Sequence, residues 1–448
     1  MKTVIAVNPG DNKGCIRLVQ TSSVFLALFA LGLVSAITGT TLFDLSQLLQ
    51  SDVENTSLVL TLRGFGVFAG SLLSTSVLYR ILNGKLVLAS AMIVGGVANA
   101  IVPFSGTLLA AQGAMLVVGM CVGILETGSN VWLVHLWKGK VAPAFQMYHL
   151  SFGVGALLPP VLSEPFLSYK EWIPLDNGSV VERYSDTHIQ VPYGLYGGVY
   201  SLTGVFMLVL FFFDSTDFSQ VPSNTEEVPK EKSSFFEWIV VGHLFVYILV
   251  LVGTEMTLAQ MLGVYLVNNR NLTFDKHSAS FVVADYWASF TSGRVVAILL
   301  SFKFLPHTII VLVQVICVLG ALVLFFLSTT YNWAVWLSIG IMGFGLAPSY
   351  GAAMAWAVRY VRLRFVHMTL VLIASCIGQS APPLLVGLSV KANPTIFVYV
   401  IAIYMTIHTI NVLAMLLSTR NRPVVFDVKD TASKSVENQV DFIDMPEI

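Results

Sequence analysis

The sequence predicts an all-α membrane protein with twelve transmembrane helices in two six-helix bundles. The composition is the first reason: 56% of the 448 residues are hydrophobic and only 11% are charged, whereas a soluble protein carries roughly a quarter charged residues. The mean hydropathy is +0.78. The second reason is that apolar runs of about 20 residues, long enough to cross a bilayer, recur along the chain. The third is that one polar segment divides these runs evenly.

Each apolar run is expected to form one membrane-spanning helix. The runs are 19–43, 57–79, 85–104, 106–136, 144–167, 192–213, 235–267, 278–301, 306–328, 333–358, 365–390 and 394–418. Residues 214–234 are polar and lack periodicity, which predicts a flexible cytoplasmic linker. The predicted domains are a cytoplasmic N-terminus at 1–18, bundles at 19–213 and 235–418, and a disordered cytoplasmic tail at 419–448.

The two halves carry a related motif at equivalent places. Gly155 and Gly378 are each followed, after three residues, by a pair of prolines, then one residue and a leucine. These motifs lie in the fifth and eleventh runs, so they predict two parallel repeats. Transporters built from such repeats rock one bundle against the other around a central site.

The distribution of positive charge predicts the orientation. Most lysines and arginines fall in the N-terminus, the linker, the tail and alternate loops, and the opposite loops hold only Lys170, Arg183, Arg270, Lys276 and Lys391. Positive charge concentrates on the cytoplasmic side, so both termini are predicted to be cytoplasmic, with the plasma membrane as the expected location. Three glycosylation sequons begin at Asn55, Asn177 and Asn271, all in predicted outer loops. Asn177, in the long loop 168–191, is the favoured acceptor.

Several classes of function are excluded. The net charge of −1 argues against a nucleic-acid surface, which needs clustered basic residues. The cysteines show neither metal-ligand nor disulfide spacing. Because no phosphate-binding loop and no nucleophilic triad can be assigned, an enzyme or an ATP-driven pump is not expected, and neither is a cofactor other than a coupling ion.

Five motifs lie at the ends and centres of the predicted helices: Gly39-Thr-Thr-Leu-Phe-Asp44-Leu, Glu126-Thr-Gly-Ser-Asn130, Gln146-x-x-His149-x-Ser-Phe-Gly153-x-Gly155, Val252-Gly-x-Glu255 and Tyr286-Trp287-x-x-Phe290-Thr-x-Gly293-Arg294. With twelve spans in two related halves, they resemble the major facilitator superfamily. Within it, they are similar to the sodium-dependent glucose transporter-like group, which is related to the fucose permeases. The resemblance implies transport of a hexose such as glucose, coupled to Na⁺ or H⁺.

The chain departs from that group at several positions. After Glu255 the group has Gly-Gly-Trp, but Ala259, Gln260 and Met261 stand here, so an aromatic that could stack on a sugar is missing. Acidic residues of the group are also replaced, by Tyr79, Val358 and Gln379. These departures bear on the identity of the sugar and on ion coupling rather than on the fold.

Four polar residues of the fourth and fifth runs form the first candidate site. Glu126 is a carboxylate inside the membrane, which must bind a proton or a cation, or pair with a base such as Arg63. Asn130 lies one turn further on the same face, and Gln146 and His149 share a face of the next helix. An amide and an imidazole suit recognition of sugar hydroxyls. The alternative for Asn130 and His149 is a hydrogen bond between helices.

The second half supplies the other candidates. Glu255 and Gln260 lie mid-helix in the seventh run, the symmetry partner of the first, and Asp285 is a third candidate acid for ion coupling. Arg294 is about 13 Å from Asp285 along one helix, so it is assigned to a gate or ion pair, as is Arg63. Trp287 and Trp356 could stack on a sugar ring, although membrane tryptophans also serve as interface anchors or in packing.

The sequence thus predicts a monomeric secondary transporter, surrounded by lipid, that moves a small polar solute by alternating access. Substrate binding is assigned to Asn130, Gln146, His149, Glu255, Gln260, Trp287 and Trp356, and ion coupling to Glu126, Glu255 and Asp285. Two alternatives stay open. One is an uncoupled facilitator for another neutral solute, and the other is a non-transporting receptor or scaffold with the same fold.

Overall fold

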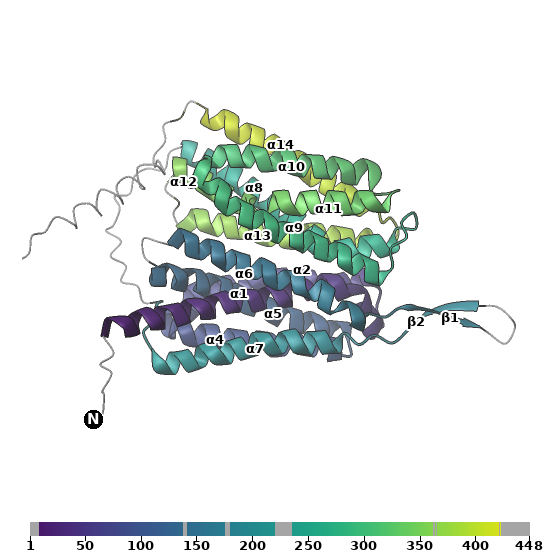
Figure 1. The fold of residues 1–448 in the computed structure, drawn as a ribbon, viewed down its shortest axis with the longest axis horizontal. Coiled ribbons are helices and arrows are strands. Elements are labelled where there is room, and N and C mark those ends of the chain that lie inside the picture. Colours follow the sequence, from purple (N-terminus) through teal and green to yellow (C-terminus); the bar gives the residue numbers. More distant parts are fainter. Residues whose placement is uncertain are drawn as a thin grey trace, which may run out of the picture.

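Long helices lie side by side along one common direction in the computed structural model (Figure 1). The structure describes residues 9–137, 141–174, 180–219, 235–361, 363, 365–420 and 422. The helices of the first half are α1 (Pro9–Leu48), α2 (Val53–Leu73), α4 (Gly84–Ile101), α5 (Leu108–Trp137), α6 (Val141–Leu162) and α7 (Gln190–Phe213). Those of the second half are α8 (Phe235–Asn268), α9 (Lys276–Lys303), α10 (Pro306–Leu327), α11 (Asn332–Leu346), α12 (Ser349–Tyr360), α13 (Phe365–Ser389) and α14 (Ile396–Thr419).

Several short elements extend or join these helices. A π-helical turn, Ser74–Leu78, and α3 (Tyr79–Ile81) prolong α2, and 3₁₀ turns follow α4 and α6 at Val102–Phe104 and Glu164–Phe166. The break between α11 and α12 comes at Pro348, where the missing N–H interrupts the helical hydrogen bonds. Asp275 starts α9 by accepting a hydrogen bond from the backbone N–H of Ser278, in a capping box.

Ten segments of the described chain are helices long and apolar enough to cross a membrane, with α11 and α12 counted as one. Helices α6 and α9 are not among them, although they have 22 and 28 residues. They are the helices that carry Gln146, His149, Asp285 and Arg294, and these polar residues lower their hydropathy. The all-helical membrane fold is therefore confirmed, while the count of twelve spans stays a prediction.

The helices of the two halves form two groups, with α1 to α7 in the lower part of Figure 1 and α8 to α14 in the upper part. We call these the N-terminal group and the C-terminal group. The first and last described residues both lie at one end of the helices, which we call the termini end. A β-hairpin projects from the opposite end, the hairpin end (Figure 1).

The motif shared by the two halves has the same structural role in each. A Cβ atom added to Gly155 of α6 would lie 2.0 Å from the carbonyl oxygen of Phe29 in α1. A Cβ atom added to Gly378 of α13 would lie 2.5 Å from the carbonyl oxygen of Leu249 in α8. Each glycine therefore lets its helix touch the backbone of the first helix of its own group. The paired prolines of both motifs lie inside their helices, as expected.

Within the described residues, the main helix contacts between the two groups are α1 with α8, α2 with α13, and α6 with α9. The backbones of the two groups approach closely at Gly39, where an added Cβ atom would lie 2.3 Å from the carbonyl oxygen of Ala259. Gly387 of α13 meets Ser57 of α2 in a similar way. These positions are near the hairpin end, so the two groups are closed together there.

Replacement of Gly39 by alanine is expected to open the hairpin end. The new methyl group would meet backbone atoms of Ala259 and Gln260, which cannot rotate away, and overpacking of this kind costs about 1–3 kcal/mol. The measurement is the distance between spin labels at positions 51 and 392, read by pulsed electron paramagnetic resonance in nanodiscs. Gly263→Ala is the matched control, since its nearest neighbour would be 3.5 Å away. Equal distances in the two variants would contradict the expectation.

The long loop 168–191, for which no strand was predicted, contains a two-stranded antiparallel hairpin. Strand β1 (Lys170–Pro174) pairs with β2 (Val180–Tyr184), and Lys170 lies opposite Tyr184. The hairpin projects beyond the helix ends (Figure 1). Asn177 belongs to 175–179, outside the described residues, whereas Asn55 and Asn271 are exposed at the same end of the molecule. Glycosylation at all three positions stays a prediction.

The start of the predicted linker is not free in the structure. The carboxylate of Asp214 accepts hydrogen bonds from Nζ of Lys85 at 2.8 Å and from Nε2 of Gln20 at 2.5 Å. Burial alone would raise the pKa of Asp214, but the hydrogen bonds from Lys85, Thr216 and Gln20 outweigh burial and hold that pKa well below its usual value. The group is thus charged at neutral pH, and its contribution to stability is lost only as the pH falls toward the lowered pKa.

Phe218 anchors the same segment to the N-terminal group. Its ring is 1% exposed and stacks on Trp132 at 5.4 Å between centroids. It fits over Gly84, where an added Cβ atom would lie 2.6 Å from the ring. The prediction of a flexible linker is therefore wrong for 214–219, because Phe218, Asp214 and Asp217, which accepts a hydrogen bond from the backbone N–H of Gly84 at 3.0 Å, fix these residues. Residues 220–234 lie outside the described part, as does all of the predicted tail except 419, 420 and 422.

Candidate functional site

Glu126 lies between the two groups of helices. It belongs to α5, and its side chain is exposed, yet elements of both groups surround it. The carboxylate is within electrostatic range of Arg63 in the N-terminal group and of Glu255 in the C-terminal group. It also influences Tyr350 on α12 and Cys376 on α13. An exposed side chain with such neighbours is directed toward the other group rather than toward lipid.

Glu255 and Arg294 form the matching part of this site in the C-terminal group. Glu255 of α8 is half-buried and interacts electrostatically with Arg294 of α9. Arg63 of α2 is 6% exposed and donates a hydrogen bond to the carbonyl oxygen of Ser35 at 3.2 Å. Each group thus places one acid and one arginine toward the middle of the molecule. Among the described residues, neither Glu126 nor Glu255 makes an ion pair shorter than 4 Å, so both carboxylates can accept a cation, a proton or a ligand.

The predicted polar residues of α5 and α6 lie near this site. Asn130 is half-buried and donates from Nδ2 to the backbone oxygen of Glu126 at 2.7 Å, which leaves its second N–H and its oxygen available. His149 is half-buried, packs on the rings of Phe145 and Tyr148, and is within electrostatic range of Arg294 of the other group. Gln146 is half-buried one turn before His149.

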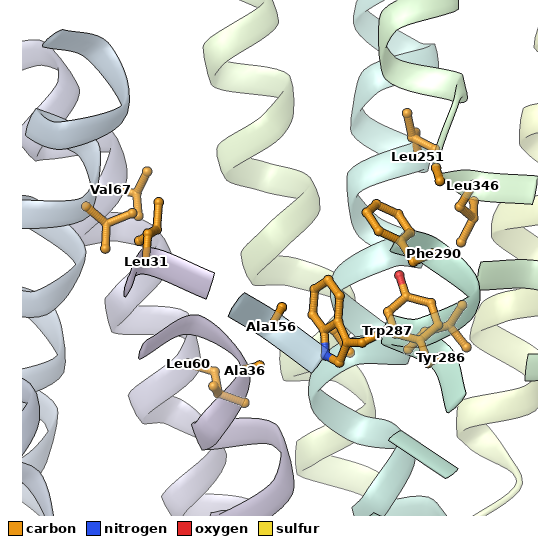
Figure 2. Packing of buried hydrophobic residues seen from close by; sticks show 14 of the residues in the cluster. Leu31, Ala36, Leu60, Val67, Ala156, Leu251, Tyr286, Trp287, Phe290 and Leu346 are labelled. Carbon is orange, nitrogen blue, oxygen red and sulfur yellow. The ribbon is translucent and has the colours of Figure 1, made fainter. Parts of the chain in front are cut away.

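Three further predicted residues are almost fully buried, and each leaves a polar atom without a partner. Oε1 of Gln260, Nε1 of Trp287 and Nε1 of Trp356 make no hydrogen bond within the described structure. Their exposures are 3%, 2% and 1%. Trp287 packs edge-on against Phe152 of α6, at 5.8 Å between ring centroids, and Figure 2 shows it beside Ala156 of the same helix. It therefore lies at the contact between the groups, and its ring face is taken up by packing.

Two tyrosines near the site were not predicted. Tyr350 is 37% exposed and lies within electrostatic range of both Glu126 and Glu255. Tyr193 of α7 is buried, accepts a hydrogen bond from Oγ1 of Thr41 at 3.2 Å and interacts with Arg63. The one signal for Tyr350 is that it follows Pro348, where the helix breaks. Tyr193 follows Pro192 in an ordinary apolar run and carries no such signal.

Asp285 lies apart from these residues. Nine residues separate it from Arg294, which at 3.6 residues per turn places the two on opposite faces of α9. A Cβ atom added to Gly340 of α11 would lie 3.4 Å from Oδ2 of Asp285, so this carboxylate faces α11. The structure does not bring Asp285 together with Glu126 and Glu255, and its role in ion coupling stays a prediction without a contact to support it.

A second charged cluster joins the groups at the hairpin end. Nζ of Lys276, the first residue of α9, lies 3.4 Å from Oδ2 of Asp44 in α1, with side-chain exposures of 5% and 1%. Lys276 also donates to Oγ of Ser168, and its ammonium lies 4.3 Å from the ring centroid of Tyr184 in β2. The backbone N–H of Ser168 donates to Oδ1 of Asp44 at 2.7 Å. We call Asp44, Ser168, Tyr184 and Lys276 the hairpin-end cluster.

Comparison with known proteins agrees with this architecture. The family model described as Major Facilitator Superfamily matches residues 24–383. Sodium-dependent glucose transporter 1 of Xenopus laevis is 25% identical over 360 residues, which cover 79% of this chain and 72% of the relative. Sodium-dependent glucose transporter 1A of Mus musculus is 25% identical, with coverage of 82% and 88%. These relatives confirm the resemblance inferred from the motifs.

Solved structures show the same fold. A D-xylose–proton symporter superposes with a TM-score of 0.66 at 12% identity, covering 91% of this chain and 98% of the other. The fucose:proton symporter of E. coli superposes with a TM-score of 0.60 at 14% identity, covering 89% and 99%.

The family match covers most of the chain, and the multiple apolar helices agree with it. The protein is therefore an integral membrane transporter and not an enzyme, as the sequence predicted. The close contacts between two helix groups and the family match together lead to one conclusion: the chain belongs to the Major Facilitator Superfamily.

Proposed function

We propose that this protein is a secondary transporter that moves a hexose by alternating access, coupled to Na⁺ or H⁺ at Glu126 and Glu255. The observation that carries the proposal is that these two acids, one from each group of helices, lie within electrostatic range of each other and make no ion pair shorter than 4 Å. The names of the sodium-dependent glucose transporters related to this chain support a sugar and an ion of this kind.

The arrangement suggests how ion and sugar binding depend on each other. Two carboxylates within electrostatic range of each other repel in a space of low polarity, and a cation or proton bound between them relieves that repulsion. A bound ion would draw α5 and α8 together, and the amide of Asn130 and the imidazole of His149 would then meet the sugar hydroxyls. Each ligand would favour the state in which the other binds well, which is the linkage that symport requires.

We further propose that the hairpin end faces outward and the termini end faces the cytoplasm, with twelve spans, a monomeric carrier and the plasma membrane as its location. The positive charges at the termini end support this orientation. The contacts between the groups near the hairpin end, with Glu126 exposed between them, then correspond to a state open to the cytoplasm.

Uptake into proteoliposomes tests the proposal. Glucose and a panel of other hexoses and pentoses are supplied with an inward Na⁺ gradient, with a proton gradient, or with neither. We expect glucose to accumulate above its external concentration under one of the two gradients. If uptake is the same with either gradient and with neither, coupling is rejected and an uncoupled facilitator is favoured. The receptor alternative would instead give no uptake of any solute and no change in cysteine accessibility at positions 130 and 146 from either side.

A further inference from the structure

The face of α9 that carries Asp285 points away from the transport site. Thr291 of α9 meets Gly153 of α6, and Arg294 interacts with Glu255 and His149. Asp285 lies about half a turn round the helix from Arg294. It faces α11, where Gly340 and Gly343 allow close packing of the two helices. No role in the central site explains why a carboxylate is present on this face.

A groove opens beside this carboxylate on the outer surface of the C-terminal group. Its volume is about 520 Å³, and its walls include Ser289, Ser292, Ile316, Trp336, Gly340 and Phe344 from α9, α10 and α11. The side chains of Ser292 and Trp336 are exposed. Sites for small molecules have volumes of this order, mostly apolar walls and a few polar groups. The lining therefore suits a ligand with a large apolar body.

Ser289 lines the groove, and the carboxylate of Asp285 adjoins it next to Gly340. An added Cβ atom at Gly340 would lie 3.4 Å from both Oδ2 of Asp285 and Oγ of Ser289. The half-buried carboxylate lies beside the hydroxyl of Ser289, since both are next to Gly340. No basic side chain within the described ranges lies within ion-pair distance of it.

The depth of Asp285 makes this lack of a counter-charge costly. Asp285 is nine residues into α9 from Lys276 at the hairpin end, a rise of about 13 Å, which places it inside a hydrocarbon layer about 30 Å thick. An acid there needs a proton or a positively charged partner. Phospholipid ammonium groups stay at the membrane surface, so a positively charged partner would come from a molecule that partitions more deeply.

We propose that this groove binds a cationic amphiphile, namely a long-chain or polycyclic primary amine dissolved in the bilayer. Its ammonium donates to Asp285 and Ser289, and its apolar body lies along Trp336 and Phe344. Trp336 also offers an aromatic face to the positive charge. A neutral alcohol of the same shape lacks the charge that the carboxylate requires. This site is separate from the transport site and does not depend on the proposed substrate.

The test is photolabelling of the full-length protein in nanodiscs. The probe is a long-chain primary amine that carries a diazirine and an alkyne, and labelled peptides are identified by mass spectrometry. We expect labelling of α9 and α11 next to the groove, competed by dodecylamine and not by dodecanol. Asp285→Asn is expected to reduce labelling about tenfold or more, because a charge-assisted hydrogen bond is lost.

A second pair of variants keeps the test independent of folding at position 285. Gly340→Leu fills the groove and is expected to abolish labelling, while Gly351→Leu is the matched control, since an added Cβ atom there meets nothing within 4 Å. Size-exclusion profiles confirm that each variant is folded. Equal competition by dodecanol, or labelling unchanged in Asp285→Asn, would overturn the proposal, whatever the outcome of the sugar-uptake experiment.

Discussion

Replacement of Lys276 by methionine is expected to open the hairpin end of the protein. The change removes the ammonium from the hairpin-end cluster and leaves the carboxylate of Asp44, whose side chain is 1% exposed, without its counter-charge. Removing one partner of a buried ion pair costs about 3–5 kcal/mol, and every 1.4 kcal/mol changes an equilibrium about tenfold. The state closed at the hairpin end should therefore lose at least about a hundredfold in population. Spin-label distances between positions 51 and 392 measure this shift.

Two variants show whether burial of the charge is the cause. Lys391 also pairs with an aspartate across the two groups, Asp52, at 3.0 Å, but these side chains are 63% and 58% exposed. Exposed pairs contribute little, so Lys391→Met should leave the distances unchanged. The double variant Asp44→Asn with Lys276→Met should recover much of the closed state, because no charge remains buried. A large opening in Lys391→Met, or none in Lys276→Met, would contradict the assignment.

Replacement of Glu126 by glutamine is expected to abolish accumulation of substrate while leaving exchange across the membrane in place. Glutamine keeps the shape and hydrogen-bonding capacity but cannot take up a proton or balance a cation beside Glu255. Loss of a charged hydrogen-bonding group costs about 1.5–3 kcal/mol, so the apparent affinity for the coupling ion should fall about tenfold or more. The measurement compares gradient-driven uptake with substrate exchange at equal concentrations on both sides.

The control for this variant is an acid outside the site. Glu171 lies in β1 at the hairpin end, so Glu171→Gln should transport like the unchanged protein. Glu255→Gln should resemble Glu126→Gln, since the two acids are within electrostatic range of each other. Full gradient-driven uptake by Glu126→Gln would remove this residue from the coupling mechanism.

Much of the fold follows from local patterns in the sequence. The length and hydropathy of each run predict a helix, and the observed helices overlap all the predicted ones. The match between Gly155 and Gly378 also predicted an equivalence that the structure supports, because a glycine beside paired prolines marks close approach of helices. Residues on a shared helix face, such as Glu126 with Asn130, could likewise be placed together from spacing alone.

Contacts between distant parts of the chain could not be predicted in this way. Lys276 appeared only as a charge in an outer loop, and nothing local links it to Asp44 or Tyr184. The hairpin was missed because its two strands are five residues each and show no clear alternation. Phe218 lies in a polar segment of the sequence, and the residues that form its pocket, Trp132 and Gly84, are distant in the chain.

Asp285 illustrates a different limit. Its presence inside an apolar run makes it a candidate acid for ion coupling, but periodicity cannot tell which side of α9 faces the other group. That choice depends on the contacts of Thr291 with Gly153 and of Asp285 with Gly340. An intramembrane acid can therefore be found from sequence, while its assignment to a transport path requires the packing of neighbouring helices.

The position of Tyr184 connects the projecting β-hairpin to the contact between the two groups of helices. This tyrosine is the last residue of β2, and its ring covers the ammonium that binds the two halves of the carrier to each other. A displacement of the hairpin would therefore move Tyr184 and change the contact between the two groups at the hairpin end. An antibody fragment that clasps the hairpin and holds Tyr184 in place would arrest the carrier in a single state, and one that pulls Tyr184 aside would release it.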